Sequence, residues 1–221
     1  MLAPHKRPKI TLKLATSLDG KIALENGDSQ WVTSEAARVH GRGLRAENDA
    51  IAIGANTAQL DNPQLTTRMP DTKDPIRIVY DSRLRLSLGS HLVTTASDTP
   101  TWVFTRASSI SKASILRDSG VIVHPVADQN GLSLEQSLDV MTAGGVDTLL
   151  IEGGGTLIAS FIRAGLFDTI HWYRAPVLLG GDGRDCVGAL SLTQMDQAIR
   201  LRRIKSVELG HDLHEIYEKV A

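Results

Sequence analysis

Residues 146–165 read VDTLLIEGGGTLIASFIRAG, and we expect the fold to be organised around this stretch. The run 148–151 predicts a buried strand, and the apolar spacing from Leu157 to Ile162 predicts an amphipathic helix. Glu152 and three glycines lie between them. Glycines allow a tight turn and close approach to a ligand, and the N-terminus of the following helix favours an anion. The stretch predicts a phosphate-binding turn, with a close-packed structural turn as the alternative.

This turn differs from the dinucleotide-binding fingerprint G-x-G-x-x-G. Counting from Gly153, Ile158 occupies the last glycine position, and the turn lies late in the chain instead of after the first strand. Any dinucleotide site here is therefore of another kind.

Composition restricts the class of protein. The chain has 221 residues, of which 42% are hydrophobic and 22% charged, as in soluble globular proteins. We expect one domain over residues 9–221 after an N-terminal extension, residues 1–8. A net charge of −1 gives no electrostatic footprint for nucleic acid or an anionic membrane. No signal peptide or membrane span is evident, so we expect a cytoplasmic protein.

Metal binding is not expected either. Cys186 is the single cysteine, which excludes an internal disulfide and a cysteine-rich zinc site. His211 and His214 have a spacing that metal ligands use, but no third ligand accompanies them.

The remaining pattern alternates strands with helices. This order predicts an α/β three-layer fold, with a mostly parallel central sheet, helices on both faces and a C-terminal antiparallel hairpin. Polar or glycine-rich segments, including a polar loop at 55–57, follow several strands, so we expect these ends to converge on one ligand cleft. The expected strands are 10–15, 50–54, 76–80, 101–105, 121–124, 148–151 and 169–175, with the hairpin at 199–207 and 214–220. Four helices are expected. The first begins after a cap at Thr33 or Ser34, two span 108–118 and 133–143, and the last follows the glycine turn.

Three side chains have two interpretations each. Lys13 either lies on a solvated strand face or points into a site. Trp31, in a polar loop, either packs on a planar ligand or anchors the core. Arg83, next to Ser82, either binds a ribose 2′-phosphate or is a solvated arginine beside an Asx turn.

Several motifs together resemble one family. Residues 13–23 read KLATSLDGKIA and residues 27–34 read GDSQWVTS. Further along lie LRA at 44–46, Thr57, LDNPQLT at 60–66, Arg68, DSR at 81–83 and IEGGG at 151–155. From about Lys9 onward the chain resembles the reductase half of the riboflavin-biosynthesis deaminase/reductase family.

The resemblance implies a dihydrofolate-reductase-like fold, a homodimer, and NADPH-dependent reduction of a ribosylamino-pyrimidine 5′-phosphate to the ribitylamino product. It places the substrate at Lys13, Ser29, Thr33, Arg45, Leu65, Arg68 and Glu152. It places NADPH at Ala15, Trp31, Thr57, Asp61, Ser82, Gly154, Gly155, Thr156, Leu157, Ile158, Ala159 and Ser160. We add Arg83 to this set, because a guanidinium next to Ser82 suits a ribose 2′-phosphate. Arginines can bind the substrate phosphate, and Glu152 can accept from pyrimidine N–H groups.

Hydride transfer from C4 of NADPH to C1′ of the substrate is the expected reaction, after the ribosylamine opens to an imine. Either Lys13 or water supplies the proton. The chain has neither the H-x-E nor the P-C-x-x-C element of a zinc deaminase. We therefore expect a stand-alone reductase that is paired with a separate deaminase, acts on the 2,5-diamino substrate, or works on another substrate altogether. The alternatives are a pterin or dihydrofolate-type reductase and a non-catalytic NADPH-binding regulatory module.

Overall fold

The computed structural model describes residues 7–128 and 131–220, and the chain forms two compact units. The first unit contains the chain through Lys9 together with Leu44–Leu150. The second contains Ile10–Gly43 and the chain from Ile151 onward. The expected single domain over 9–221 stays a prediction.

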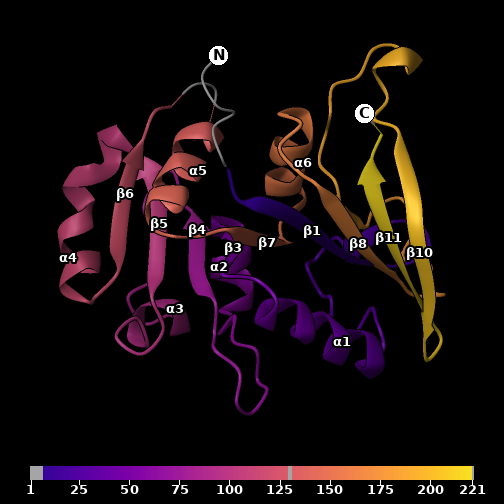
Figure 1. Ribbon diagram of the computed structural model, residues 1–221, viewed down its shortest axis with the longest axis horizontal. Helices are drawn as coiled ribbons and strands as arrows, with labels where there is room; N and C mark the ends of the chain where they lie inside the picture. The colour runs from indigo at the N-terminus through magenta and orange to yellow at the C-terminus, as the bar shows by residue number, and fades with distance from the viewer. Residues whose placement is uncertain (1–6, 129–130, 221) are drawn as a thin grey trace. The chain divides into compact units, whose positions relative to one another are not determined.

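The first unit is built on parallel strands that are buried on both faces. Ala50, Ile51, Ala52 and Ile53 are at most 1% exposed, as a continuous apolar run predicts for a central strand. The strands β3 (Ala50–Gly54), β4 (Ile76–Tyr80), β5 (Thr101–Arg106) and β6 (Ile122–Val126) pair side by side in this order, all in parallel (Figure 1).

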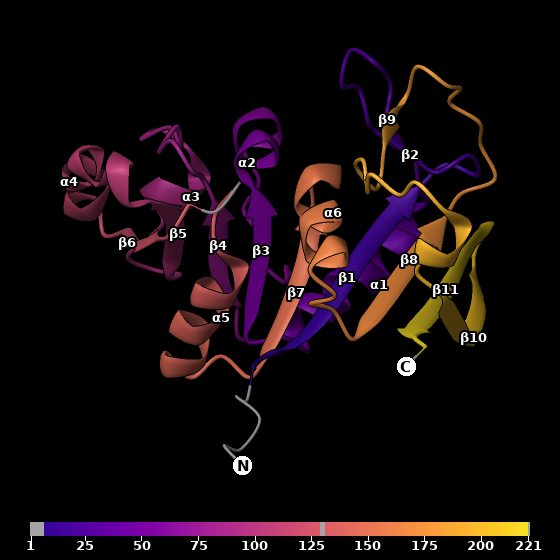
Figure 2. The ribbon, with the colours of Figure 1, turned by 90° about the horizontal axis from the view of Figure 1, so that it is seen from above.

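Short helical segments connect these strands. Ser133 caps α5, because its hydroxyl accepts a hydrogen bond from the N–H of Gln136. Figure 2 shows α5 running alongside the strands of this unit. The segments are α2 (Ala55–Asp61), α3 (His91–Thr94), the 3₁₀ helix Ala107–Lys112, α4 (Ala113–Asp118) and α5 (Leu134–Ala143).

The second unit combines parallel and antiparallel strands. β1 (Lys9–Thr16), most of which lies in this unit, pairs in parallel with β8 (Thr169–Arg174). β8 pairs antiparallel with β11 (Asp212–Lys219), which forms a hairpin with β10 (Leu201–Leu209). A small ribbon joins β2 (Lys21–Ala23) to β9 (Arg184–Asp185).

Two helices lie on opposite sides of β1 and β8 (Figure 1). α6 (Gly155–Arg163) follows β7 (Thr148–Gly153), whose residues from Ile151 belong to this unit. On the other side lies α1 (Glu35–Ala46), most of which belongs to this unit, and a short 3₁₀ helix (Met195–Gln197) precedes β10. Ser34 caps α1, because its hydroxyl accepts from the N–H of Ala37.

The α/β class, the mostly parallel strands and the C-terminal antiparallel hairpin are confirmed. Two local expectations are wrong. Residues 55–57 are not a polar loop, because α2 begins at Ala55, directly after β3. The helix expected over 108–118 begins as a 3₁₀ helix and becomes α-helical only at Ala113.

Candidate functional site

The glycine turn is a strand-to-helix turn with an open helix end. Gly154 precedes α6 with φ of +81°, a conformation that side chains with a Cβ rarely adopt. Within the described chain no side chain caps this helix, so the first-turn N–H groups are donors without a side-chain acceptor. Together with the helix dipole, these donors favour an anionic ligand group.

Gly155 is required by the protein itself. A Cβ at this position would lie 2.5 Å from the carbonyl oxygen of Asp185 and 3.3 Å from that of Cys186. The segment is fixed to the turn by a hydrogen bond of 2.9 Å from the N–H of Gly188 to the carbonyl of Gly155. The close-packing interpretation therefore holds for Gly155, whereas phosphate binding at the first turn of α6 stays a prediction.

The expected cofactor positions from Gly154 to Ser160 differ in exposure. Leu157, Ile158 and Ala159 are at most 8% exposed and belong to the core of the second unit. Any contact they make with a ligand is through the main chain. The half-buried Gly154, Gly155 and Ser160 and the exposed Thr156 are the members with accessible surface of their own.

Lys13 and Glu152 lie together in the second unit. The ammonium Nζ of Lys13, in β1, is 4.0 Å from Oε2 of Glu152, in β7, and both side chains are mostly buried, 19% and 8% exposed. Ala15, two residues on in β1, is half-buried. Leu12 and Leu14 are buried, so the expected alternation of β1 is confirmed and Lys13 lies on its polar face. A cation and a carboxylate side by side present one donor and one acceptor to a ligand.

The loop that carries Ser29, Trp31 and Thr33 precedes α1. Trp31 is 68% exposed, so the alternative that it anchors the core is wrong. Its indole instead lies against the guanidinium of Arg38, whose Cζ is 4.2 Å from the ring centroid. Arg38 also donates to the carbonyl of Thr33, at 2.5 Å. Ser29 is exposed, whereas Thr33 is 8% exposed.

The first unit holds Arg45, Leu65 and Arg68. Leu65 and Arg68 have φ of +58° and +53°, which is unfavourable for residues other than glycine. Such conformations persist where the surroundings hold them and are common at functional sites. The Leu65 side chain is 3% exposed and fixes the loop in the core, whereas Arg68 is exposed.

Hydrogen bonds hold this loop in place. Arg45 donates from Nη1 to the carbonyl of Thr66 at 2.8 Å. The carboxylate of Asp74 accepts from the N–H of Thr67 at 2.8 Å, and the hydroxyls of Thr67 and Thr72 are 2.7 Å apart. Arg45 is therefore partly a structural residue. The exposed Arg68 lies in a loop whose backbone is held by the hydrogen bonds of Arg45 and Asp74.

The remaining cofactor positions, Thr57, Asp61, Ser82 and Arg83, also lie in the first unit. Thr57 is half-buried and Asp61 exposed, both in α2. Arg85 connects α2 to the segment after β4, because its Nη2 donates to Oδ1 of Asn56, at 3.3 Å.

Asp81 organises that segment. Its buried carboxylate accepts from the N–H groups of Arg83, Arg85 and Leu86 at 3.4, 2.5 and 2.9 Å. The bond to Arg83 is the Asx turn expected as one alternative, and the Arg83 side chain is exposed. The half-buried Ser82 precedes it. Its role beside a 2′-phosphate stays a prediction.

Sequence reasoning missed a cluster of aromatic and imidazole rings around Tyr173. Nδ1 of His40 is 2.8 Å from the Tyr173 hydroxyl, and the His214 ring stacks on Tyr173 with centroids 4.4 Å apart and planes inclined by 11°. Nε2 of His214 is 3.3 Å from Nδ1 of His171. Burial, with the nearby His171, His40 and Lys205, lowers the pKa of His214 to about 4. The members of this cluster come from α1, β8 and β11, which are far apart in the chain, so no local sequence signal indicates it.

The residues that the structure describes contain neither a candidate metal site nor a candidate membrane-spanning helix. Within 7–128 and 131–220 there is no group of three or more His, Cys, Asp or Glu side chains that could hold a metal ion. No helix in the described part of the chain is both long and apolar enough to cross a membrane.

The comparisons with known proteins concern nearly the whole chain. A family model described as the RibD C-terminal domain matches residues 8–214. The chain belongs to the RibD C-terminal domain family. The riboflavin biosynthesis protein RibD of Bacillus amyloliquefaciens is 40% identical over 209 residues, which are 93% of this chain but 56% of that protein. The chain thus spans about half the length of that relative.

An archaeal relative is matched over nearly its full length. The 2,5-diamino-6-ribosylamino-4(3H)-pyrimidinone 5′-phosphate reductase of Methanothermobacter thermautotrophicus is 35% identical over 213 residues, which are 94% of this chain and 96% of that protein. Among solved structures, Acinetobacter baumannii RibD, form 2, has a TM-score of 0.86 at 28% identity and is matched over 98% of this chain and 59% of that chain. The RibD-type α/β fold is therefore shared.

Proposed function

We propose that this chain is an oxidoreductase that uses NADPH to reduce a ribosylamino-pyrimidine 5′-phosphate to the ribitylamino compound in riboflavin biosynthesis. The name of the archaeal relative supports this reaction, since the match extends over 96% of that reductase. The observation that carries the proposal is the Lys13–Glu152 pair next to the glycine turn. Fold alone would not separate this reaction from other reductions.

Glu152 and Lys13 suit a pyrimidine with neighbouring N–H and oxygen groups. The carboxylate accepts from the amino and ring N–H groups, and the ammonium binds an oxygen or stabilises developing negative charge. Either Lys13 or a water molecule supplies the proton that the substrate takes up. Arg45 and Arg68 bind the ribose phosphate, with Arg68 providing the more accessible guanidinium. Ser29, Thr33 and Leu65 complete the proposed substrate-binding set.

The cofactor positions fit a phosphorylated dinucleotide chemically. The uncapped first turn of α6 offers N–H donors for a phosphate, and the exposed Arg83 with Ser82 offers a guanidinium and a hydroxyl for a 2′-phosphate. Trp31 offers an exposed aromatic face. The proposed set also includes Ala15, Thr57 and Asp61. When bound, NADPH supplies the hydride.

The test is loss of NADPH absorbance with purified protein and three separate compounds. These are the deaminated ribosylaminopyrimidine phosphate, its 2,5-diamino form and a dihydropterin. Turnover of either phosphate supports the proposal and identifies the substrate form. Turnover of the dihydropterin alone replaces it with a pterin reductase. NADPH binding without turnover of any compound replaces it with a regulatory module. Equal affinity for NADH would remove the role of Ser82 and Arg83.

Within the same proposal, the chain acts in the cytoplasm as a homodimer, and a separate deaminase handles the preceding or following step. Sedimentation equilibrium of the purified protein tests the dimer, because a monomer at micromolar concentration would contradict it.

A further inference from the structure

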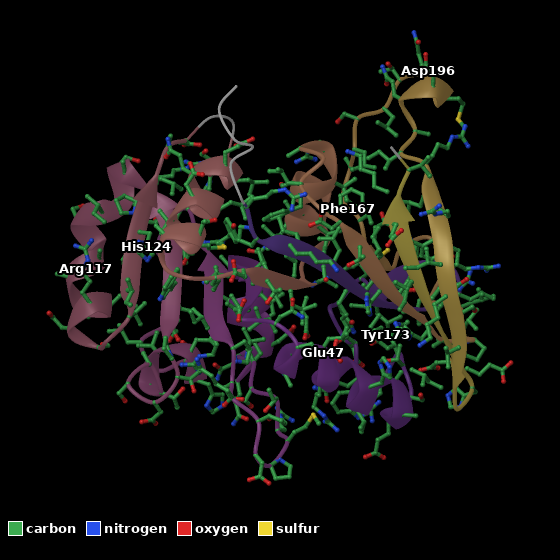
Figure 3. All side chains as sticks on the ribbon, viewed as in Figure 1. Glu47, Arg117, His124, Phe167, Tyr173 and Asp196 are labelled. Carbon is green, nitrogen blue, oxygen red and sulfur yellow. The ribbon has the colours of Figure 1, made fainter. Side chains whose placement is uncertain are left out.

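Two histidines, a tyrosine and a lysine lie on one face of neighbouring strands in the second unit. Ala15 in β1 and His214 in β11 are the register partners of Tyr173 in β8, and Lys13 is the partner of His171. Register partners on neighbouring strands point to the same face of a sheet. These five side chains therefore share one face. α1 lies against this face, because His40 of α1 is within hydrogen-bond distance of Tyr173, which Figure 3 labels close to α1.

Tyr173 is held over its ring and at its hydroxyl. It is 1% exposed, the His214 ring lies parallel to it, and Nδ1 of His40 is within hydrogen-bond distance of its hydroxyl. His171 in turn contacts His214, at 3.3 Å between ring nitrogens. A ring fixed at its hydroxyl and over its surface has little freedom to rotate or tilt. Tyr173 is thus a rigid element of the second unit.

The group that faces this rigid ring is the ammonium of Lys13. Its Nζ lies 5.8 Å from the Tyr173 centroid, within the range of a cation–π interaction. α1 approaches the pair through Gly41, where an added Cβ would lie 3.5 Å from Cε of Lys13 and 4.0 Å from Cζ of Tyr173. Tyr173, Gly41 and Glu152, whose Oε2 is 4.0 Å from Nζ, therefore together restrict the lysine.

We propose that Tyr173 is a positioning residue that holds the Lys13 ammonium beside Glu152, through its ring face, with His40 and His214 fixing the ring. This inference rests on the proposed function, in which Lys13 contacts the substrate. A free lysine loses rotamer entropy when a ligand fixes it, so restricting it before the substrate arrives lowers the cost of forming the productive geometry.

The first experiment measures Lys13 directly, without substrate or cofactor. The protein is acetylated sparingly with an N-hydroxysuccinimide ester, and the rate at Lys13 is read by peptide mass spectrometry relative to the exposed Lys9 and Lys73. In Tyr173→Leu the Lys13 rate should rise about threefold, since the ammonium loses the ring face. Tyr173→Phe keeps the ring and should leave the rate within about twofold of wild type. Tyr173→Met replaces the leucine variant should the latter not fold.

The second experiment is a double-mutant cycle with turnover. Tyr173→Leu should lower kcat/KM about tenfold in the wild-type background but less than about twofold in a Lys13→Met background, because its effect passes through Lys13. A purely structural tyrosine would cause the same loss in both backgrounds.

Two outcomes overturn the inference: an unchanged Lys13 acetylation rate in the folded variant that lacks the ring, Tyr173→Leu or its replacement Tyr173→Met, or equal losses of kcat/KM in the two backgrounds. Failure of the proposed function has a different signature, since the wild-type protein would then reduce neither pyrimidine phosphate. In that case the acetylation rates alone decide whether Tyr173 restrains Lys13.

Discussion

Arg45 and Arg68 have different surroundings, and this difference separates their expected effects. Arg68 is exposed, whereas Arg45 also holds the loop through the carbonyl of Thr66. Arg68→Gln should raise KM for the phosphorylated substrate by about tenfold to a hundredfold, the worth of one charge-assisted hydrogen bond, with kcat and stability nearly unchanged. Arg45→Gln should raise KM and also lower the free energy of unfolding by about 1 kcal/mol. Steady-state kinetics and urea unfolding measure both.

The control for this prediction is the dephosphorylated substrate. Its turnover should be equally poor with the wild type and Arg68→Gln, because the group that Arg68 binds is missing. If Arg68→Gln lost as much activity on the dephosphorylated compound as on the phosphate, Arg68 would not be the phosphate ligand.

The local surroundings of single side chains were predictable from sequence where chemistry and alternation agreed, whereas their roles in a site stay predictions. Lys13 lies on the polar side of an alternating strand, and Glu152 comes directly before three glycines. Tyr173 was not predictable, because its neighbours His40 and His214 are far away in the chain and come together only through strand register and the packing of α1. Register between distant strands leaves no local signal.

Gly155 and Gly43 form a natural pair for testing the glycine turn. A Cβ at Gly155 meets the carbonyl of Asp185 at 2.5 Å, whereas nothing lies within 4 Å of a Cβ at Gly43, inside α1. Gly155→Ala should therefore lower the free energy of unfolding by about 2 kcal/mol through overpacking. Gly43→Ala should raise it by about 0.5–1 kcal/mol, because the unfolded chain loses freedom. Urea unfolding measures both, and equal effects of the two variants would refute the packing role of Gly155.

The loop 177–183 is tied down by one carboxylate. Asp19 accepts from the N–H groups of Leu179 and Gly180 and from the hydroxyl of Ser17. The Ser17 hydrogen bond, followed by that from Gly180, lowers the pKa of Asp19 to about 2, so it stays ionised near neutral pH.

Asp19→Asn replaces one acceptor oxygen with a donor and should release this loop. Amide hydrogen exchange at Leu179 and Gly180 should become about tenfold faster, while exchange in β3 stays the same. Asp196→Asn, which changes an exposed carboxylate outside this loop, is the control and should leave both amides unchanged. Unaltered exchange in Asp19→Asn would mean that other contacts hold the loop.

Whole elements were predicted best where burial is complete. The bounds of β3 and β4 agree with the expected ranges, since strands covered on both faces are continuous apolar runs between polar residues. α2 was missed because its sequence, ANTAQLD, is short and polar and starts without a capping side chain. Its helical form depends on packing by Ala55 and Ala58, which are 6% and 2% exposed, and such tertiary effects override local propensity.

We expect a buried imidazole, that of His214, to make the stability of the molecule sensitive to acid. His214 is 3% exposed and packed by Tyr173, His40 and His171, with Lys205 nearby. Burial is the main cause that lowers its pKa from 6.5 to about 4, with the neighbouring charges adding to it. The unfolded chain therefore binds a proton between these two pH values that the folded chain does not. The stability contributed by the neutral ring is complete above pH 6.5 and is lost as the pH falls toward 4.

This linkage predicts a measurable slope. Across the window between pH 6.5 and 4, the free energy of unfolding should fall by up to about 1.4 kcal/mol per pH unit in the wild-type protein. His214→Phe keeps a flat ring but takes up no proton, so its free energy of unfolding should vary much less in this window, whatever its value at neutral pH. His211→Asn, which changes a side chain that is 73% exposed, should keep the wild-type slope. Urea unfolding at several pH values distinguishes the variants. Parallel curves for the wild type and His214→Phe would place the acid sensitivity in groups other than His214.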